Sequence, residues 1–103
     1  RDYVYVKDVV RGYLLLLDKI GQTQGKAYNI SSGESLNVLD VLKIIEATLG
    51  KKVKYKILNT QKNEIPFQSL NYDKIKKLGY ASRYRVVNVL PAISAWYEDC
   101  FAQ

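Results

Sequence analysis

The sequence predicts an α/β fold in which short strands alternate with amphipathic helices. β-branched and aromatic residues cluster in three short segments, and between these segments apolar residues recur with helical spacing. Residues that favour helix ends stand at the borders of the helical segments. The 103 residues are 48% hydrophobic and 25% charged, which is typical of one globular domain. The expected order is strand, helix, strand, helix, strand, small helix, helix, an α/β or α+β arrangement.

The first third of the chain predicts two strands around one helix. Residues 3–6, "YVYV", have strand composition. Asp8 is a suitable N-cap for a helix over 9–20, because its side-chain oxygen can accept a free backbone N–H. Gly21 is expected to end that helix. After a polar loop, residues 26–31, "KAYNIS", predict a second strand.

The middle third carries the strongest helix signal. Asn37 is expected to cap a helix, and Asp40 in its first turn suits the positive end of the helix dipole. Gly50 is expected to stop the helix. Residues 52–58, "KVKYKIL", alternate charged and apolar side chains, which predicts a strand with one wet face. The expected buried stripe of the helix is Val38, Leu39, Leu42, Ile45 and Leu49.

The last third predicts an irregular stretch and two helices. Pro66 limits the stretch around it to an extended loop or an edge strand. Asp73 is expected to cap a short helix that finishes at Gly79.

A final helix is predicted from about 88 to 101. Pro91 is expected in its first turn, where the missing N–H costs least. Trp96 and Tyr97 are expected to anchor this helix in the core.

The composition excludes several kinds of active site. With no histidine and one cysteine, Cys100, the chain by itself cannot build a zinc site or a Cys-His or Ser-His nucleophile. Its longest apolar run is four leucines, against roughly 20 residues for a membrane span. The single cysteine gives no internal disulfide. We therefore expect a soluble, cytoplasmic protein without contact to a membrane.

Tyr3 and Lys7 have the spacing of a tyrosine–lysine proton-transfer pair. Such a pair meets on a helix, where residues four apart have Cβ atoms about 5–6 Å from each other. On a strand the same spacing separates the Cα atoms by roughly 13 Å. Because residues 3–6 have strand composition, we expect no catalytic pair here.

Three stretches together carry a resemblance to a known family. "RDYVYVKDVVRGYLLLL" resembles the R-D-[FY]-[IV]-[YH]-V-x-D segment of the extended short-chain dehydrogenase/reductases, the NAD-dependent nucleotide-sugar epimerases and dehydratases. "YNISSGESLNVLDVLKIIEATLGK" is similar to their Y-N-[IL]-G-x-G strand and the helix after it. "LNYDKIKKLGY" and "LPAISAWYED" are similar to their A-D-x-S-K-x-x-x-L-G-[WY] segment and terminal helix.

The resemblance covers only the C-terminal, substrate-binding portion of such an enzyme, matched by residues 1–103. It implies the last strand of the Rossmann sheet plus a small α+β subdomain. The Gly-rich dinucleotide fingerprint and the Tyr-x-x-x-Lys helix of the N-terminal NAD-binding domain are absent. The resemblance therefore implies NAD for the full-length enzyme, but no cofactor, catalytic residue or activity in this chain alone. We expect the chain to depend on the missing domain or to self-associate.

The resemblance also implies that four residues bind the substrate, and that this substrate is a nucleoside-diphosphate sugar. Arg1 matches an arginine that contacts the diphosphate, and a guanidinium suits phosphate oxygens. Glu64 matches an acid that binds a ribose hydroxyl. Gln61 stands where the family has a phosphate-binding arginine, so the neighbouring Lys62 would supply positive charge as a point charge. Gln68 matches a position that faces the sugar.

The alternative function is a small basic nucleic-acid-binding module. Residues 51–85 contain ten basic and two acidic residues, a net charge of +8. Such clustering can follow a phosphate backbone, and tyrosines among it can stack on bases. However, Lys52, Lys54 and Lys56 alternate as on an exposed strand face, where lysines block aggregation. This pattern favours the enzyme portion over the nucleic-acid module.

Overall fold

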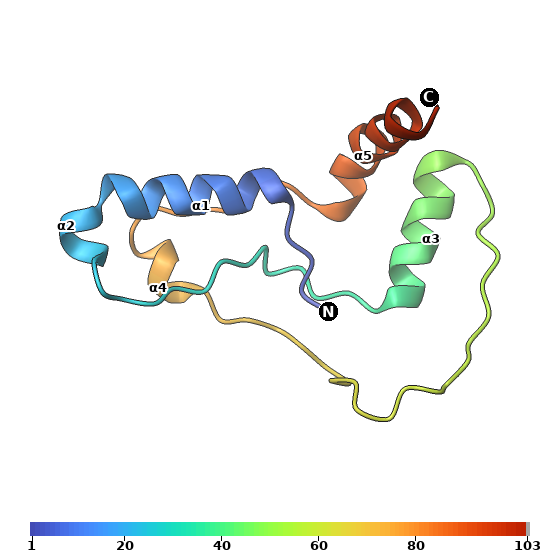
Figure 1. The fold of residues 1–103 in the computed structure, drawn as a ribbon, viewed down its shortest axis with the longest axis horizontal. Helices are drawn as coiled ribbons and strands as arrows, with labels where there is room; N and C mark the ends of the chain where they lie inside the picture. Colours follow the sequence, from blue (N-terminus) through green and yellow to red (C-terminus); the bar gives the residue numbers. More distant parts are fainter. Residues whose placement is uncertain (103) are drawn as a thin grey trace.

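The computed structural model describes residues 1–102, and five helices lie in that range (Figure 1). Near one end of the molecule α1 continues into the short α2, with α4 close by (Figure 1). At the other end α3 and α5 pack against each other. A long extended segment joins α3 to α4 around the outside of the molecule (Figure 1). The bounds are α1 Val6–Asp18, α2 Ile20–Thr23, α3 Val38–Leu49, α4 Asp73–Lys76 and α5 Val86–Phe101.

The prediction of strands at 3–6, 26–31 and 52–58 is wrong. Within residues 1–102 no segment is a strand, and strand-like pairing is limited to one antiparallel bridge between Asp2 and Ser35. A helix satisfies its backbone groups within its own segment, whereas a strand needs a neighbouring strand. The helical half of the predicted α/β class is therefore present, and its sheet is not formed by these residues.

Helix α1 begins earlier than Asp8 predicts. The carbonyl of Tyr5 accepts from the N–H groups of Asp8 and Val9, so the helix starts at Val6 and Asp8 lies inside its first turn. Asp8 does not cap the helix because its carboxylate binds another part of the chain. The helix ends at Asp18, before the expected stop at Gly21, and Gly21 lies in α2.

Helix α3 has both of the predicted ends. The side-chain oxygen of Asn37 accepts from the N–H of Leu39 at 2.8 Å, and Gly50 ends the helix with φ 65°. Glu46 then accepts from the N–H of Val53 at 2.8 Å and holds the segment that follows. The predicted stripe is not fully buried: Val38 is 57% exposed and the other four residues are half-buried. Helix α3 packs mainly against α5, and its apolar side is only partly covered.

Helix α4 begins with Asp73 instead of being capped by it. The residue before the helix is Tyr72, and Asp73 lies in the first turn, 3.0 Å from the ammonium group of Lys76. The hydrogen bond from Lys76 lowers the pKa of Asp73, and the same contact raises the pKa of Lys76. Gly79 follows the helix with φ 104°.

Helix α5 also begins earlier than expected, at Val86. Pro91 consequently lies in the second turn, where it has no N–H to donate to the carbonyl four residues before it. The expectation that Trp96 and Tyr97 form part of the core is wrong, since they are 60% and 52% exposed. Their rings pack against each other edge to face instead.

The core of the described chain is small for its length. Its buried hydrophobic residues are Ile75, Tyr80 and Val89. The accessible surface is 8180 Å², whereas a folded monomer of this mass exposes about 5,900 Å². The radius of gyration is 16.8 Å, against about 13 Å for a compact domain of 100 residues. Much apolar surface is therefore left without a cover.

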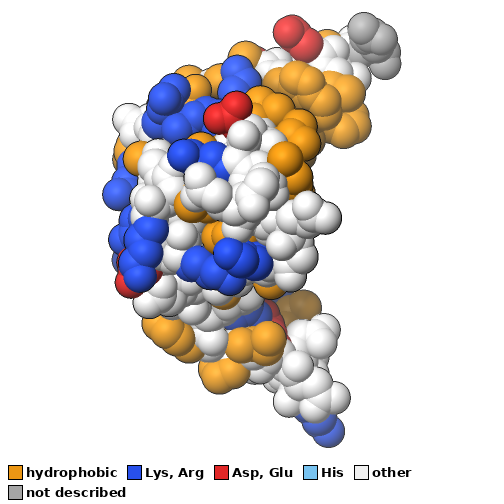
Figure 2. Space-filling view, turned by 90° about the vertical axis from the view of Figure 1, so that its left-hand side faces the viewer, with side chains coloured by type: hydrophobic (Ala, Val, Ile, Leu, Met, Phe, Trp, Pro, Cys, Tyr) orange, Lys and Arg blue, Asp and Glu red, His pale blue; other side chains and the backbone are white. Residues whose placement is uncertain are grey.

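One apolar face of α1 and α2 accounts for part of this surface. Hydrophobic side chains lie exposed beside lysine and arginine side chains on the side of the molecule that contains α2 (Figure 2). This exposed apolar surface is not a membrane span, because each helix within residues 1–102 is too short or too polar to span a bilayer. The exposed face is formed by Val6, Val10, Tyr13, Leu14, Leu17 and Ile20, which recur at helical spacing.

Candidate functional site

A cavity of about 680 Å³ lies beside Arg1. This volume falls in the range of pockets that hold small ligands. Three segments form its wall: Arg1 itself, the stretch 35–38 that leads into α3, and part of the extended segment, 59–67. The lining residues from the last two segments are Ser35, Leu36, Asn37, Val38, Asn59, Glu64, Ile65, Pro66 and Phe67.

Arg1 connects the walls of this cavity. Its guanidinium donates to the Glu64 carboxylate at 3.0 Å and to the carbonyl of Ile65. Its backbone nitrogen donates to the carbonyl of Leu36 at 2.9 Å, and the N–H of Leu36 donates to the carbonyl of Arg1 at 2.9 Å. A guanidinium carries five N–H donors, so donors remain for an anion in the cavity.

The ion pair of Arg1 and Glu64 is weak enough to rearrange. The two side chains are 32% and 64% exposed. Exposed pairs of this kind contribute about 0–1 kcal/mol. A diphosphate with two or more negative charges could therefore replace Glu64 as the partner of Arg1 at small cost, leaving Glu64 free to accept from a hydroxyl group.

Two of the four residues nominated by the resemblance line the cavity, and two do not. Arg1 and Glu64 contact each other although 63 positions separate them. Gln61 lies exposed on the extended segment, outside the residues that line the cavity. Gln68 is also exposed, and its carbonyl accepts from the Ser35 hydroxyl at 3.1 Å. Binding roles for all four residues remain predictions.

Asn37 and Phe67 line the same cavity, although neither is among the site residues expected from the sequence. The sequence predicts Asn37 only as a cap. Its amide oxygen does cap α3, which leaves the amide nitrogen as a donor. Phe67 is 74% exposed at the cavity wall. An aromatic residue beside Pro66 in an otherwise polar stretch was the available signal for it.

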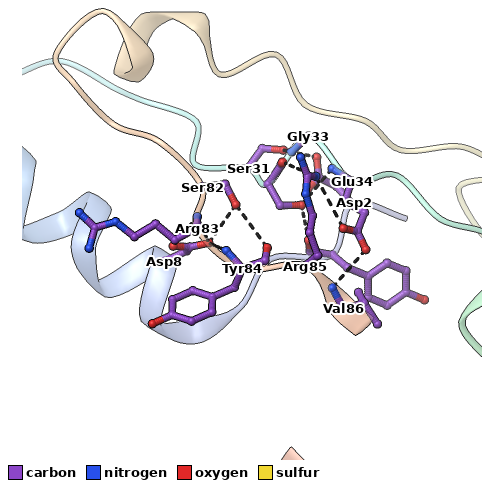
Figure 3. Close-up of polar contacts among 12 residues, drawn as sticks. Asp2, Asp8, Ser31, Gly33, Glu34, Ser82, Arg83, Tyr84, Arg85 and Val86 are labelled. Carbon is purple, nitrogen blue, oxygen red and sulfur yellow. Dashed lines mark hydrogen bonds and ion pairs between the residues drawn. The ribbon is translucent and has the colours of Figure 1, made fainter. Parts of the chain in front are cut away.

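A second polar cluster surrounds Asp8 (Figure 3). Asp8 is fully buried and accepts from the Arg11 guanidinium at 2.5 Å and the Ser82 hydroxyl at 2.9 Å. It also accepts from the backbone N–H groups of Arg83 and Tyr84, each at 3.1 Å. A buried carboxylate with this many donors is satisfied. The cluster is therefore an anchor between α1 and the segment before α5, and the Asp8 carboxylate has its hydrogen bonds within the chain.

Glu34 holds the start of α5 in a similar way (Figure 3). Its carboxylate accepts from the N–H of Val86 at 3.2 Å and lies 3.6 Å from the Arg85 guanidinium. A carboxylate at a helix N-terminus is stabilising because it accepts a free N–H and faces the positive end of the helix dipole.

The tyrosines and lysines around α4 bear on the nucleic-acid alternative. Lys74 lies 4.5 Å from the ring centre of Tyr28, and Lys76 lies 4.5 Å from that of Tyr72. Tyr80 is buried. Rings that are covered by lysines or buried are not free to stack on bases. Around α4 the basic stretch is thus engaged with the chain itself.

The described residues contain no group of three or more His, Cys, Asp or Glu side chains that could hold a metal ion. They also do not fit a dinucleotide site, which needs closely spaced glycines before a helix. Helices α1 and α3 follow Tyr5 and Asn37, and Gly33 is a single glycine four residues before Asn37.

Comparison with known proteins finds UDP-glucose 4-epimerases among the relatives of this chain. "UDP-glucose 4-epimerase 3" of Oryza sativa subsp. japonica is 33% identical over 90 residues, which cover 84% of this chain and 24% of the relative. "UDP-glucose 4-epimerase" of Bos taurus is 29% identical over 101 residues, 96% of this chain and 29% of the relative. The chain is similar to part of a nucleotide-sugar epimerase. The resemblance stated from the sequence motifs is confirmed.

A bacterial relative agrees with these two. "UDP-glucose 4-epimerase" of Erwinia amylovora is 40% identical over 58 residues, which cover 55% of this chain and 17% of the relative. The chain thus spans less than a third of the length of each of these relatives. No family model matches the chain. The similarity to these enzymes implies a short-chain dehydrogenase-type fold, and the described residues would contribute helices to it.

Proposed function

We propose that the chain binds a nucleoside-diphosphate sugar in the cavity beside Arg1, as the substrate-binding portion of an NAD-dependent nucleotide-sugar epimerase or 4,6-dehydratase. The contact between Arg1 and Glu64 carries this proposal. The two residues were nominated separately for diphosphate and ribose, and they line one cavity at 3.0 Å from each other. The relatives act on UDP-glucose by their names, so UDP-glucose is the first ligand to test.

The lining chemistry suits each part of such a ligand. The Arg1 guanidinium presents a planar set of donors that matches phosphate oxygens. Glu64 accepts from ribose hydroxyls once the diphosphate has taken its place at Arg1. The Asn37 amide nitrogen and the Ser35 hydroxyl can hydrogen-bond the polar groups of the ligand, and the exposed ring of Phe67 offers apolar contact.

NAD and the proton-transfer pair would belong to a part of the enzyme outside residues 1–103. The residues present do not fit the cofactor, and Tyr3 precedes α1 while Lys7 lies within it, so these two do not form a pair on one helix. The isolated chain should therefore turn over no nucleotide sugar. Detectable conversion of UDP-glucose by the purified chain would contradict this part of the proposal.

The proposed binding role is tested by calorimetric titration of UDP-glucose into the chain and its Arg1 variants. Arg1→Ala removes hydrogen bonds to a charged group, worth about 1.5–3 kcal/mol, so affinity should fall by about 10- to 150-fold. Arg1→Lys keeps the charge but loses the planar donor set, so its affinity should lie between those of Arg1→Ala and the unaltered chain. Arg83→Ala, which removes another exposed arginine, is the matched control and should leave affinity unchanged. Equal affinities for all four proteins would overturn the proposal.

A further inference from the structure

We propose that Asp2 is a positioning residue for the Arg1 cavity, holding together the three chain segments that form its wall. This inference rests on the proposed function. Asp2 follows Arg1 directly. One oxygen of its carboxylate accepts from the Ser31 hydroxyl at 2.5 Å and from the backbone N–H of Leu70 at 3.2 Å.

The two contacts of Asp2 lie next to the cavity wall, on the two segments that supply its lining residues. Asp2 follows Arg1, whose backbone exchanges two hydrogen bonds with Leu36. Ser31 is fully buried and starts the loop that reaches the lining residue Ser35. Leu70 lies three positions beyond the lining residue Phe67. One carboxylate oxygen therefore links the residue after Arg1 to the chain that leads into 35–38 and to the chain that leaves 59–67.

The contact with Leu70 matters most for the extended segment. Residues 54–69 are exposed, and the contacts of Glu64 with Arg1 and of Gln68 with Ser35 are made at the surface. Exposed hydrogen bonds and ion pairs give little net stability, because water competes for the same groups. The contact of Leu70 with Asp2 is partly buried, so it holds this segment in place more firmly.

The other oxygen of Asp2 also supports a role of this residue in the cavity. It is buried and has no hydrogen-bond partner among the described residues. A buried carboxylate oxygen without a donor is unfavourable for folding and calls for an explanation. Asp8 differs, because both of its oxygens have partners. A carboxylate whose second oxygen is unfavourable for folding fits a role in the cavity better than a role in stability alone.

The test is a calorimetric titration of UDP-glucose into the chain and four variants. Asp2→Ala should weaken binding by about tenfold or more, because the three segments lose their common acceptor. Asp2→Asn should restore affinity to within about threefold of the unaltered chain, since an amide oxygen can accept the same two hydrogen bonds. Ser31→Ala should weaken binding, whereas Ser82→Ala should not. Both serine variants remove a hydroxyl that donates to a carboxylate, but the partner of Ser82 is Asp8.

The amide signal of Leu70 provides a readout that does not depend on the ligand. It should shift in Asp2→Ala and return in Asp2→Asn, which a general loss of stability would not produce. If Asp2→Ala does not fold, the comparison of Ser31→Ala with Ser82→Ala decides the question.

The outcomes separate the two proposals. Binding of UDP-glucose by the unaltered chain with equal affinity for Asp2→Ala would overturn the role of Asp2 and leave the proposed function standing. Equal weakening by Ser31→Ala and Ser82→Ala would also overturn it. No binding by the unaltered, folded chain would overturn the proposed function, and the role of Asp2 with it.

Discussion

Asp2 and Asp8 are carboxylates of the same chain whose surroundings give them different tasks. Asp8 is satisfied by a guanidinium, a hydroxyl and two backbone N–H groups, so it fixes one segment against another. Asp2 has one oxygen with two donors and one with none. Removing a partner from a satisfied buried charge is costly, by about 3–5 kcal/mol for buried ion pairs. The roles of these two aspartates therefore differ because the hydrogen-bond donors around them differ.

Tyr80 gives a pH dependence at the residue scale. It is buried, its hydroxyl donates to the carbonyl of Ser31 at 3.3 Å, and burial raises its pKa. The unfolded chain releases this proton near pH 10, whereas the folded chain retains it to higher pH. The stabilisation is present in full below about pH 10 and is lost as pH rises through the folded-state pKa.

As pH rises from about 9 to 11, the free energy of unfolding of the unaltered chain should fall. In Tyr80→Phe it should fall by less, because phenylalanine has no proton to release. Urea unfolding across this range measures the effect. Tyr13→Phe is the control, because it removes the hydroxyl of an exposed tyrosine. Parallel curves for Tyr80→Phe and the unaltered chain would contradict the account of Tyr80.

At the scale of elements, local signals predicted helices well and strands poorly. Asn37 and Gly50 mark the ends of α3 because a cap and a left-handed glycine act within a few residues. The start of α1 was predicted wrongly because Asp8 does not cap it. Its carboxylate instead accepts hydrogen bonds from residues 82–84, which are distant in the sequence. The strands could not be judged locally either, because strand pairing depends on a partner.

The candidate site was predictable only in part for the same reason. The family resemblance nominated Arg1 and Glu64 one at a time, and their contact appears only when the chain is folded. The positions of Asn37 and Phe67 in the cavity wall, and the link from Asp2 to Leu70, depend on tertiary structure that no local pattern encodes.

The cap of α3 can be tested by one substitution. Asn37→Ala removes the acceptor for the N–H of Leu39 and should lower the free energy of unfolding by about 1 kcal/mol. Urea unfolding monitored by circular dichroism measures this change. Asn63→Ala, on the exposed extended segment, should change it by less than about 0.5 kcal/mol. An equal effect of the two substitutions would show that the cap does not stabilise the helix.

At the scale of the whole molecule, the chain exposes more surface than a folded monomer of its mass. The apolar face of α1 and α2 is part of this surface, and such faces usually pack against another element or another chain. In the proposed enzyme the NAD-binding part would cover it. Alone, the chain should cover it by self-association.

Sedimentation velocity tests this expectation. The chain should associate increasingly as its concentration rises, and Leu17→Lys should weaken the association because it places a charge in the apolar face. Ile57→Lys introduces the same charge at an exposed site on the extended segment and should leave association unchanged. A monomer at all concentrations would contradict the expectation.

The central claim is that the cavity beside Arg1 binds a nucleoside-diphosphate sugar. Its most direct test is an NMR titration of the folded chain with UDP-glucose at low and at physiological salt, beside a titration with a short DNA or RNA strand. The account predicts saturable shifts at Arg1, residues 35–38 and residues 64–67 that persist at physiological salt. No shift with UDP-glucose, together with salt-sensitive shifts across residues 51–85 on adding nucleic acid, would contradict it and favour the nucleic-acid module.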